Sequence, residues 1–250
     1  MIGTIVLIHG AWQGSWAFEA WRPLLAARGW RSVAVDLPGN GWNPQPLTGN
    51  GLDCQAAHVA RVLADQPGPC VVLGHSGGGL AASQVAERVP DRVAALVYLV
   101  GMMLPSGMRF ADLIAAQPAG DFSGIGPYLE WSDGGAMSAV PPQAALDIFL
   151  HDCPPDAARQ AAAHLRPQPE AGRAVAPRLS AERYGRIPRI YVEALQDRSI
   201  DIRLQRAMQA LSPGAARITL DCGHVPQLAM PDVLTDRLCG ALDRLFQANS

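Results

Sequence analysis

The chain has 250 residues, of which 49% are hydrophobic and 17% are charged, and its formal net charge is −2. This size and composition predict one globular domain with room for an inserted segment. The near balance of 20 basic and 22 acidic residues excludes a large basic field, so we expect neither nucleic acid nor a membrane surface as a partner.

Six short apolar runs, rich in β-branched residues, predict the strands of one sheet. Continuous apolar runs are typical of parallel strands that helices cover on both faces. In chain order the predicted strands are residues 4–8, 31–35, 70–73, 94–100, 189–194 and 217–220. Segments with helical spacing lie between or after them, at residues 16–28, 52–66, 77–89 and from about 231 onward. This alternation predicts an α/β fold.

The stretch of residues 104–185 breaks the alternation. It is rich in Pro and Gly and holds short helical patterns at residues 143–150 and 156–165. Because a structureless loop of this length is uncommon inside a domain, we expect a helical cap here. The cap, residues 104–185, would be inserted into a core made of residues 1–103 and 186–250.

The cysteines and the N-terminal segment bear on the compartment and on metal binding. The five cysteines are widely spaced and include no CxxC pair, so we expect reduced thiols, no metal site and no cofactor. The first ten residues lack the basic residues of a signal peptide, and no stretch reaches the ~20 apolar residues of a membrane span. We therefore expect a cytoplasmic protein. Arg without any Lys, with abundant Ala and Pro, indicates a GC-rich bacterial source.

A glycine-rich corner at Ser76 is the strongest functional signal. Gly74-His75-Ser76-Gly77-Gly78 matches G-x-S-x-G where a predicted strand meets a predicted helix. A strand that turns directly into a helix leaves its turn residue strained and exposed, and the glycines avoid clashes there. The Ser76 hydroxyl would thus serve as a nucleophile at the carboxyl end of the sheet. A turn in which the serine only caps the helix is the structural alternative.

A serine nucleophile needs a base, and the base needs an acid that orients it. His224 follows the last predicted strand in "LDCGHVPQ", and Asp197 follows the fifth in "YVEALQDRS". Glu193 lies inside a strand and Asp221 is too close to His224 in sequence, so both are weaker candidates for the acid. The chain order Ser76, Asp197, His224 is that of an α/β-hydrolase.

An oxyanion hole and a substrate pocket complete the expected site. One backbone N–H is expected from Gly77 and a second from Ala11, after the first strand, where Gly10 permits close approach. His9 is expected to be structural. Apolar side chains are expected to line a pocket under the cap, which favours an apolar or aromatic ester. They are Trp12, Met102, Met103, Leu104, Tyr128, Trp131, Phe149 and Leu150, although each of them is also a candidate for the core.

The segments "LIHGAWQGSWAF", "GHSGGG", "YVEALQDRS" and "CGHVPQLAMP" resemble the α/β-hydrolase superfamily, and within it the small esterase and hydroxynitrile lyase group that includes plant methyl salicylate esterases. The likeness covers about residues 2–103 and 187–247. It implies about six strands and a serine carboxylesterase that works through an acyl-enzyme. Cyanide-releasing members usually carry Thr where Gly10 stands and Lys where Val225 stands, so esterase chemistry is favoured.

Several alternatives stay open on the same triad. They are a hydroxynitrile lyase, a carbon–carbon bond hydrolase and a cofactor-free haloperoxidase. A small-molecule receptor that keeps the hydrolase fold with little turnover is a further alternative. The expected partner is a small-molecule ester, and a homodimer is compatible with the sequence.

Overall fold

The computed structural model describes residues 2–117 and 124–247. Its main feature is a six-stranded, fully parallel sheet with the order β2-β1-β3-β4-β8-β9. The strands are β1 (Gly3–Ile8), β2 (Trp30–Val35), β3 (Cys70–His75), β4 (Val93–Leu99), β8 (Arg189–Ala194) and β9 (Ala215–Leu220). All six predicted strands are therefore confirmed.

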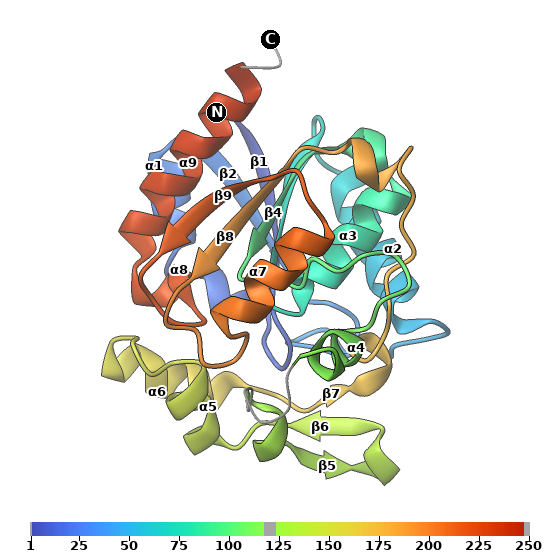
Figure 1. The fold of residues 1–250 in the computed structure, drawn as a ribbon. Coiled ribbons are helices and arrows are strands. Elements are labelled where there is room, and N and C mark those ends of the chain that lie inside the picture. Colours follow the sequence, from blue (N-terminus) through green and yellow to red (C-terminus); the bar gives the residue numbers. More distant parts are fainter. Residues whose placement is uncertain (1, 118–123, 248–250) are drawn as a thin grey trace.

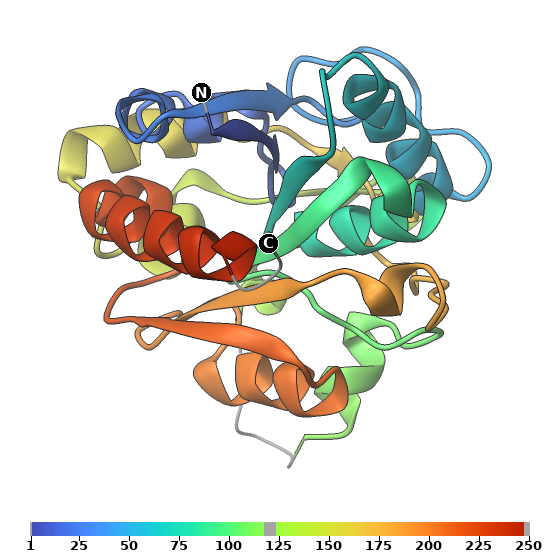
Figure 2. The same ribbon diagram turned by 90° about the horizontal axis from the view of Figure 1, so that it is seen from above.

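Helices cover both faces of the sheet (Figures 1 and 2). On one face lie α2 (Gly51–Ala64), α3 (Gly78–Arg88) and α7 (Ile202–Leu211), whose buried residues share a core cluster with Val6, Val72 and Leu96. On the other face lie α1 (Arg22–Ala27) and α9 (Pro231–Gln247), which pack with Ile5 and Val71. Neighbouring strand residues enter opposite clusters because side chains alternate along a strand. This explains why each strand reads as a continuous apolar run.

The first predicted helix is split in the structure. Residues Ser15–Phe18 form a 3₁₀ turn, η1, and α1 begins only at Arg22. Pro23 stands in the first turn of α1, where its missing N–H removes no helical hydrogen bond. The remaining 3₁₀ turns are Pro90–Arg92, Gly126–Tyr128, Asp133–Gly135, Glu170–Gly172 and Tyr184–Arg186, and one short helix, α8, spans Pro226–Ala229.

The segment inserted between β4 and β8 lies across the carboxyl ends of the strands (Figure 1). It holds the helices α4 (Phe110–Ala115), α5 (Pro142–Ile148) and α6 (Pro155–His164). The expected cap is not purely helical, however, because it also contains an antiparallel sheet of β5 (Glu130–Ser132), β6 (Met137–Ala139) and β7 (Gln168–Pro169). Gly134 and Gly135 have positive φ angles of 64° and 90°, which suits the tight connection from β5 to β6.

The returning end of this segment packs on the core rather than over the sheet edge. Arg178 N donates to Gln84 Oε1 at 2.9 Å, and Ser180 N donates to Glu87 Oε2 at 2.9 Å, so the chain follows α3 on its way to β8. Tyr184 belongs to the same core cluster as α3.

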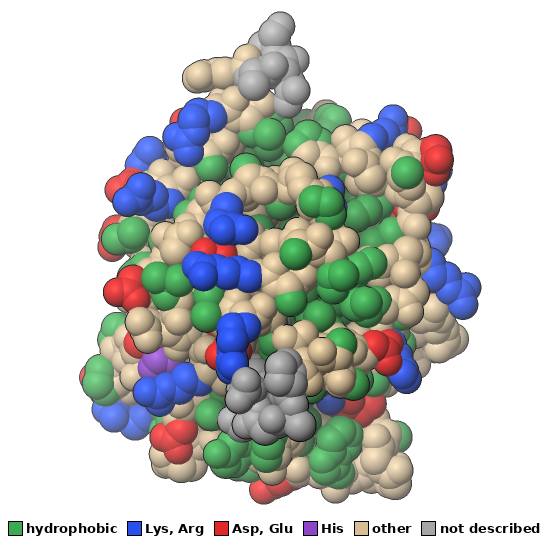
Figure 3. All heavy atoms as spheres, in the orientation of Figure 1, with side chains coloured by type: hydrophobic (Ala, Val, Ile, Leu, Met, Phe, Trp, Pro, Cys, Tyr) green, Lys and Arg blue, Asp and Glu red, His purple; other side chains and the backbone are tan. Residues whose placement is uncertain are grey.

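Two surface properties agree with the composition. On the face in Figure 3, basic and acidic side chains are interspersed among hydrophobic ones, and they form no single field of one sign. Within the described ranges, no helix combines the length and the apolar character that crossing a bilayer requires.

Candidate active site

Ser76 occupies a strained corner between β3 and α3. Its φ of 51° lies in the left-handed region, which non-glycine residues rarely adopt. The corner is held from both sides, since Ser76 N donates to Leu99 O at 3.1 Å and Ser76 O accepts from Met102 N at 2.9 Å. A Cβ atom on Gly74 would lie only 2.5 Å from the carbonyl oxygen of Gly78. Glycine at position 74 is therefore a steric requirement of the corner.

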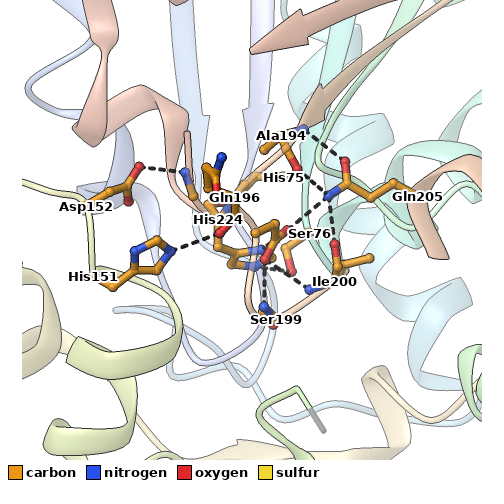
Figure 4. A network of polar contacts seen from close by, with 12 residues as sticks. His75, Ser76, His151, Asp152, Ala194, Gln196, Ser199, Ile200, Gln205 and His224 are labelled. Atoms are coloured by element: carbon orange, nitrogen blue, oxygen red, sulfur yellow. Dashed lines mark hydrogen bonds and ion pairs between the residues drawn. The ribbon is translucent and has the colours of Figure 1, made fainter. Parts of the chain in front are cut away.

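Three side chains from distant parts of the chain meet at this corner, of which Ser76 and His224 are labelled in Figure 4. His224 Nε2 lies 3.0 Å from Ser76 Oγ, and His224 Nδ1 lies 2.8 Å from Asp197 Oδ2. Ser76 follows β3, Asp197 follows β8 and His224 follows β9, so the parallel sheet delivers all three to one edge. All three are buried. The structure thus brings together the three residues that the sequence selected.

The Asp197 carboxylate is held by several donors. Oδ1 accepts from the backbone N–H groups of Ser199 at 2.7 Å and Ile200 at 3.0 Å. Oδ2 accepts from His224 and from Gln205 Nε2, the latter at 3.3 Å. These contacts fix the orientation of the carboxylate toward the imidazole.

Gln205 is a site residue that the sequence did not reveal. Its side chain is fully buried in α7, where Oε1 accepts from Ala194 N at 3.0 Å and Nε2 lies 2.7 Å from Ile200 O. It therefore connects the end of β8 with the loop that carries Asp197. Glutamine on an amphipathic helix reads as a surface residue, and no motif distinguishes this one.

His75 is a second such residue. Its Nε2 donates to the backbone oxygen of His224 at 2.8 Å, and its Nδ1 lies 3.0 Å from Gln13 Oε1. Burial, followed by the proximity of His224, lowers the pKa of His75 from 6.5 to about 3. A neutral His75 thus connects the loop of His224 with the strand that precedes Ser76.

The two amides expected to form the oxyanion hole lie side by side. A Cβ atom on Gly77 would lie 3.6 Å from Ala11 N. Within the described ranges, neither Ala11 N nor Gly77 N has a hydrogen-bond partner. A Cβ atom on Gly10 would lie 3.0 Å from Ser76 Cβ, so a larger residue at position 10 would press on the nucleophile.

His9 anchors the same loop. Its Nδ1 donates to Gly10 O at 2.8 Å, and its Nε2 accepts from Leu37 N at 3.2 Å. Burial lowers its pKa, which fits a neutral ring with one donor and one acceptor. Its contacts are those of the structural residue that the sequence predicted.

Four of the eight expected pocket residues lie close to the site. Trp12, Phe149 and Leu150 share an apolar cluster with Val225, and the Phe149 ring stacks on the His224 ring at 5.2 Å and 29°. The backbone N–H of Met102 donates to the Ser76 carbonyl oxygen.

The other four expected pocket residues lie elsewhere. Met103 and Leu104 are enclosed in the core cluster of α2 and α3 with 0% exposure, so the structure does not place them on the wall of a cavity. Tyr128 and Trp131 are 50% and 54% exposed, since the elements that carry them, η3 (Gly126–Tyr128) and β5, are short surface segments of the cap.

Two cavities lie in this part of the molecule, and the smaller one has the expected oxyanion-hole residues in its wall. A cavity of about 220 Å³ lies between η1, α6 and α8, with Gln13, Trp16, Leu150, His164 and Val225 among its walls. A water-sized cavity of about 20 Å³ has Ala11 and Gly77 in its wall, together with Gln168.

The fold and the site together define an enzyme of the serine hydrolase class. The chain belongs to the alpha/beta hydrolase family, whose model matches residues 5–237. A pyrethroid hydrolase of Sphingobium wenxiniae is 31% identical, and the alignment covers 97% of this chain and 88% of that protein. The putative methylesterase 13 of Arabidopsis thaliana is 28% identical over 92% of this chain, which spans 54% of that protein's length.

The crystal structure of a pyrethroid hydrolase from Sphingobium faniae matches with a TM-score of 0.83 and 29% identity, covering 96% of this chain and 97% of that chain. The predictions of an α/β-hydrolase fold and of a hydrolase that acts on ester bonds are thereby confirmed.

Proposed function

We propose that this protein is a carboxylesterase that cleaves a small, mainly apolar or aromatic ester through an acyl-enzyme intermediate. The observation that carries the proposal is the unbroken chain of contacts from Asp197 through His224 to the Ser76 hydroxyl, at 2.8 and 3.0 Å. Such a chain activates a hydroxyl that is otherwise a poor nucleophile.

In the proposed mechanism, Ser76 Oγ attacks the ester carbonyl while His224 Nε2 takes the hydroxyl proton. Asp197 keeps the Nδ1 proton of His224 in place and stabilises the imidazolium. The tetrahedral oxyanion accepts hydrogen bonds from the amides of Ala11 and Gly77, each contributing on the order of 3 kcal/mol. His224 then protonates the leaving alcohol, and water hydrolyses the acyl-enzyme by the same route.

The surroundings of Ser76 support an uncharged substrate. Trp12, Phe149 and Leu150 belong to one apolar cluster, and the Phe149 ring stacks on the ring of His224. The name of the pyrethroid hydrolase relative makes a pyrethroid a suitable test substrate. A cytoplasmic location and a bacterial source stay predictions from the sequence.

The test is steady-state turnover of p-nitrophenyl acetate and of a panel that contains aryl esters, a pyrethroid, a lactone, a cyanohydrin and a carbon–carbon hydrolase substrate. We expect an acylation burst with the activated ester, and its loss in Ser76→Ala with the fold intact. Retained turnover in Ser76→Ala would refute the assignment of the nucleophile. Preferred cleavage of the cyanohydrin would favour a lyase, and stoichiometric binding without turnover would favour a receptor.

A further inference from the structure

The cap segment after α5 contacts both loops that carry the candidate catalytic acid and base (Figure 4). His151 Nε2 donates to the carbonyl oxygen of Gln196, at 3.0 Å, directly before Asp197. Asp152 Oδ2 accepts from the backbone N–H of Gly223, at 2.5 Å, directly before His224. Two neighbouring cap residues thus hold the two loops, one each.

This contact is tightly packed. A Cβ atom on Gly223 would lie 2.5 Å from Asp152 Oδ1 and 2.8 Å from His151 Nε2, so a larger residue at position 223 would force these two side chains to move. The hydrogen bond from Gly223 N–H to Asp152 has a carboxylate acceptor, and hydrogen bonds to carboxylates are roughly twice as strong as those between neutral groups.

Further contacts from the same stretch of the cap reach the same two loops. Arg198, which follows Asp197, donates through Nη1 to Asp147 O at 3.0 Å. Phe149 lies over the His224 ring. Residues 147–152 therefore touch the acid loop twice and the base loop twice.

Backbone hydrogen bonds between the ends of β8 and β9 join these two loops to each other. Leu195 N donates to Leu220 O, and Gln196 N donates to Cys222 O, each at 2.9 Å, which continues the ladder of β8 and β9 beyond the strands. This ladder ends before His224. The position of His224 relative to the rest of the loop therefore depends on contacts from outside the ladder, which include His75 on one side and the cap on the other.

We propose that His151 and Asp152 are positioning residues that couple docking of the cap to assembly of the Ser76–His224–Asp197 triad. The proposal rests on the esterase function proposed above. Neither side chain touches the reacting atoms. Their effect comes through the backbone at Gln196 and Gly223, which fixes where Asp197 and His224 project. Since a misplacement of about 1 Å can lower a rate about 100-fold, loosening these anchors should act on the chemical step.

The main test compares Asp152→Ala with Asp156→Ala. Asp156 is an exposed carboxylate of the same cap, in the first turn of α6 and paired with Arg159. We expect Asp152→Ala to lower kcat for p-nitrophenyl acetate at least tenfold with KM within about twofold of wild type. Asp156→Ala should leave both unchanged. Asp152→Asn keeps an oxygen acceptor for Gly223 N–H and should recover most of the loss.

Titration of active sites with a fluorophosphonate separates positioning from simple destabilisation. A merely structural role would lower the melting temperature and the number of reactive sites while kcat per site stayed at the wild-type value. That outcome, or an equal loss in Asp156→Ala, would overturn the proposal. His151→Gln retains an N–H donor for Gln196 O and should be more active than His151→Ala.

A double-mutant cycle tests the contact itself. Gly223→Ala alone should lower kcat because its methyl group meets Asp152. In the Asp152→Ala background the same change should cost several-fold less. If the loss of kcat in the double variant equalled the product of the two single losses, Asp152 and Gly223 would not act through a common contact.

Different results would refute the positioning role of His151 and Asp152 and the proposed esterase function. If the wild-type enzyme turned over no ester, the proposed esterase function would be refuted. The positioning role of His151 and Asp152 could still be tested through the imidazole NMR signals of His224. We expect the proton between His224 Nδ1 and Asp197 to be observed in wild type and in Asp156→Ala, and to be lost in Asp152→Ala. If this proton signal persisted in Asp152→Ala, the positioning role would be refuted whatever the substrate is.

Discussion

The Nε2 atom of His224 lies 3.0 Å from the Oγ atom of Ser76, although 148 positions of the chain separate the two residues. In the proposed mechanism the hydroxyl is activated only through the imidazole, so the two groups should act as one unit. We predict that Ser76→Ala and His224→Ala each lower kcat by about 10⁴- to 10⁶-fold, and that the double variant loses little more. Single-turnover assays on an activated ester measure this. A double variant whose loss equals the product of the single losses would argue against a shared step.

Gly74→Ala should destabilise the protein because the new methyl group would meet the backbone at Gly78 and Gly79, which cannot rotate away. Overpacking of this kind lowers the free energy of unfolding by about 1–3 kcal/mol. Urea titration measures the change. Gly68→Ala is the matched control, since a Cβ there meets nothing within 4 Å. Equal midpoints for the two variants would contradict the close approach at the corner.

Gln205→Leu should affect both stability and activity. It leaves the buried N–H of Ala194 without its acceptor and removes one donor from Asp197. An unsatisfied buried polar group costs roughly 1–3 kcal/mol, so we expect a loss of about 2 kcal/mol in the free energy of unfolding, together with a lower kcat. Gln143→Leu, on the exposed surface of α5, should change neither quantity. Wild-type kcat in Gln205→Leu would show that Asp197 needs no support from α7.

His75 should make the protein less stable in acid. Its pKa is lowered from 6.5 to about 3, so between these values the unfolded chain binds a proton that the folded protein does not. The free energy of unfolding therefore falls as the pH drops below about 6.5, by up to about 1.4 kcal/mol per pH unit from this group. Its contribution is complete above pH 6.5. Urea titrations from pH 4.5 to 7 should give a shallower dependence for His75→Gln, and an unchanged slope would contradict a neutral buried His75.

The strands were predictable because residues such as Val71 and Val72 face two different helical layers and must both be apolar. The cap sheet was not predictable. Its strand β5 has three exposed residues, too few for an alternation to emerge, and β7 has only two. Likewise, α7 was not predictable from an apolar pattern, because its buried face includes the polar residues Gln205 and Gln209. These side chains form hydrogen bonds with other elements of the fold.

Ser76, Asp197 and His224 could be predicted from the sequence because each lies in the segment that follows a recognisable strand and their order is characteristic. The burial of Met103 and Leu104 in the core could not be predicted, because an apolar sequence after β4 does not indicate which layer of the fold its side chains enter. His75 and Gln205 could not be found, since their importance lies in partners that only the folded chain brings near.

The parallel sheet also sets a timetable for biosynthesis. The β3 corner leaves the ribosome long before β8 and β9, whose loops carry the acid and the base. A nascent chain that ends before residue 224 holds its serine without a proton acceptor. Under the proposed mechanism, esterase activity should therefore arise only after the C-terminal unit of β8, α7 and β9 has docked beside β4.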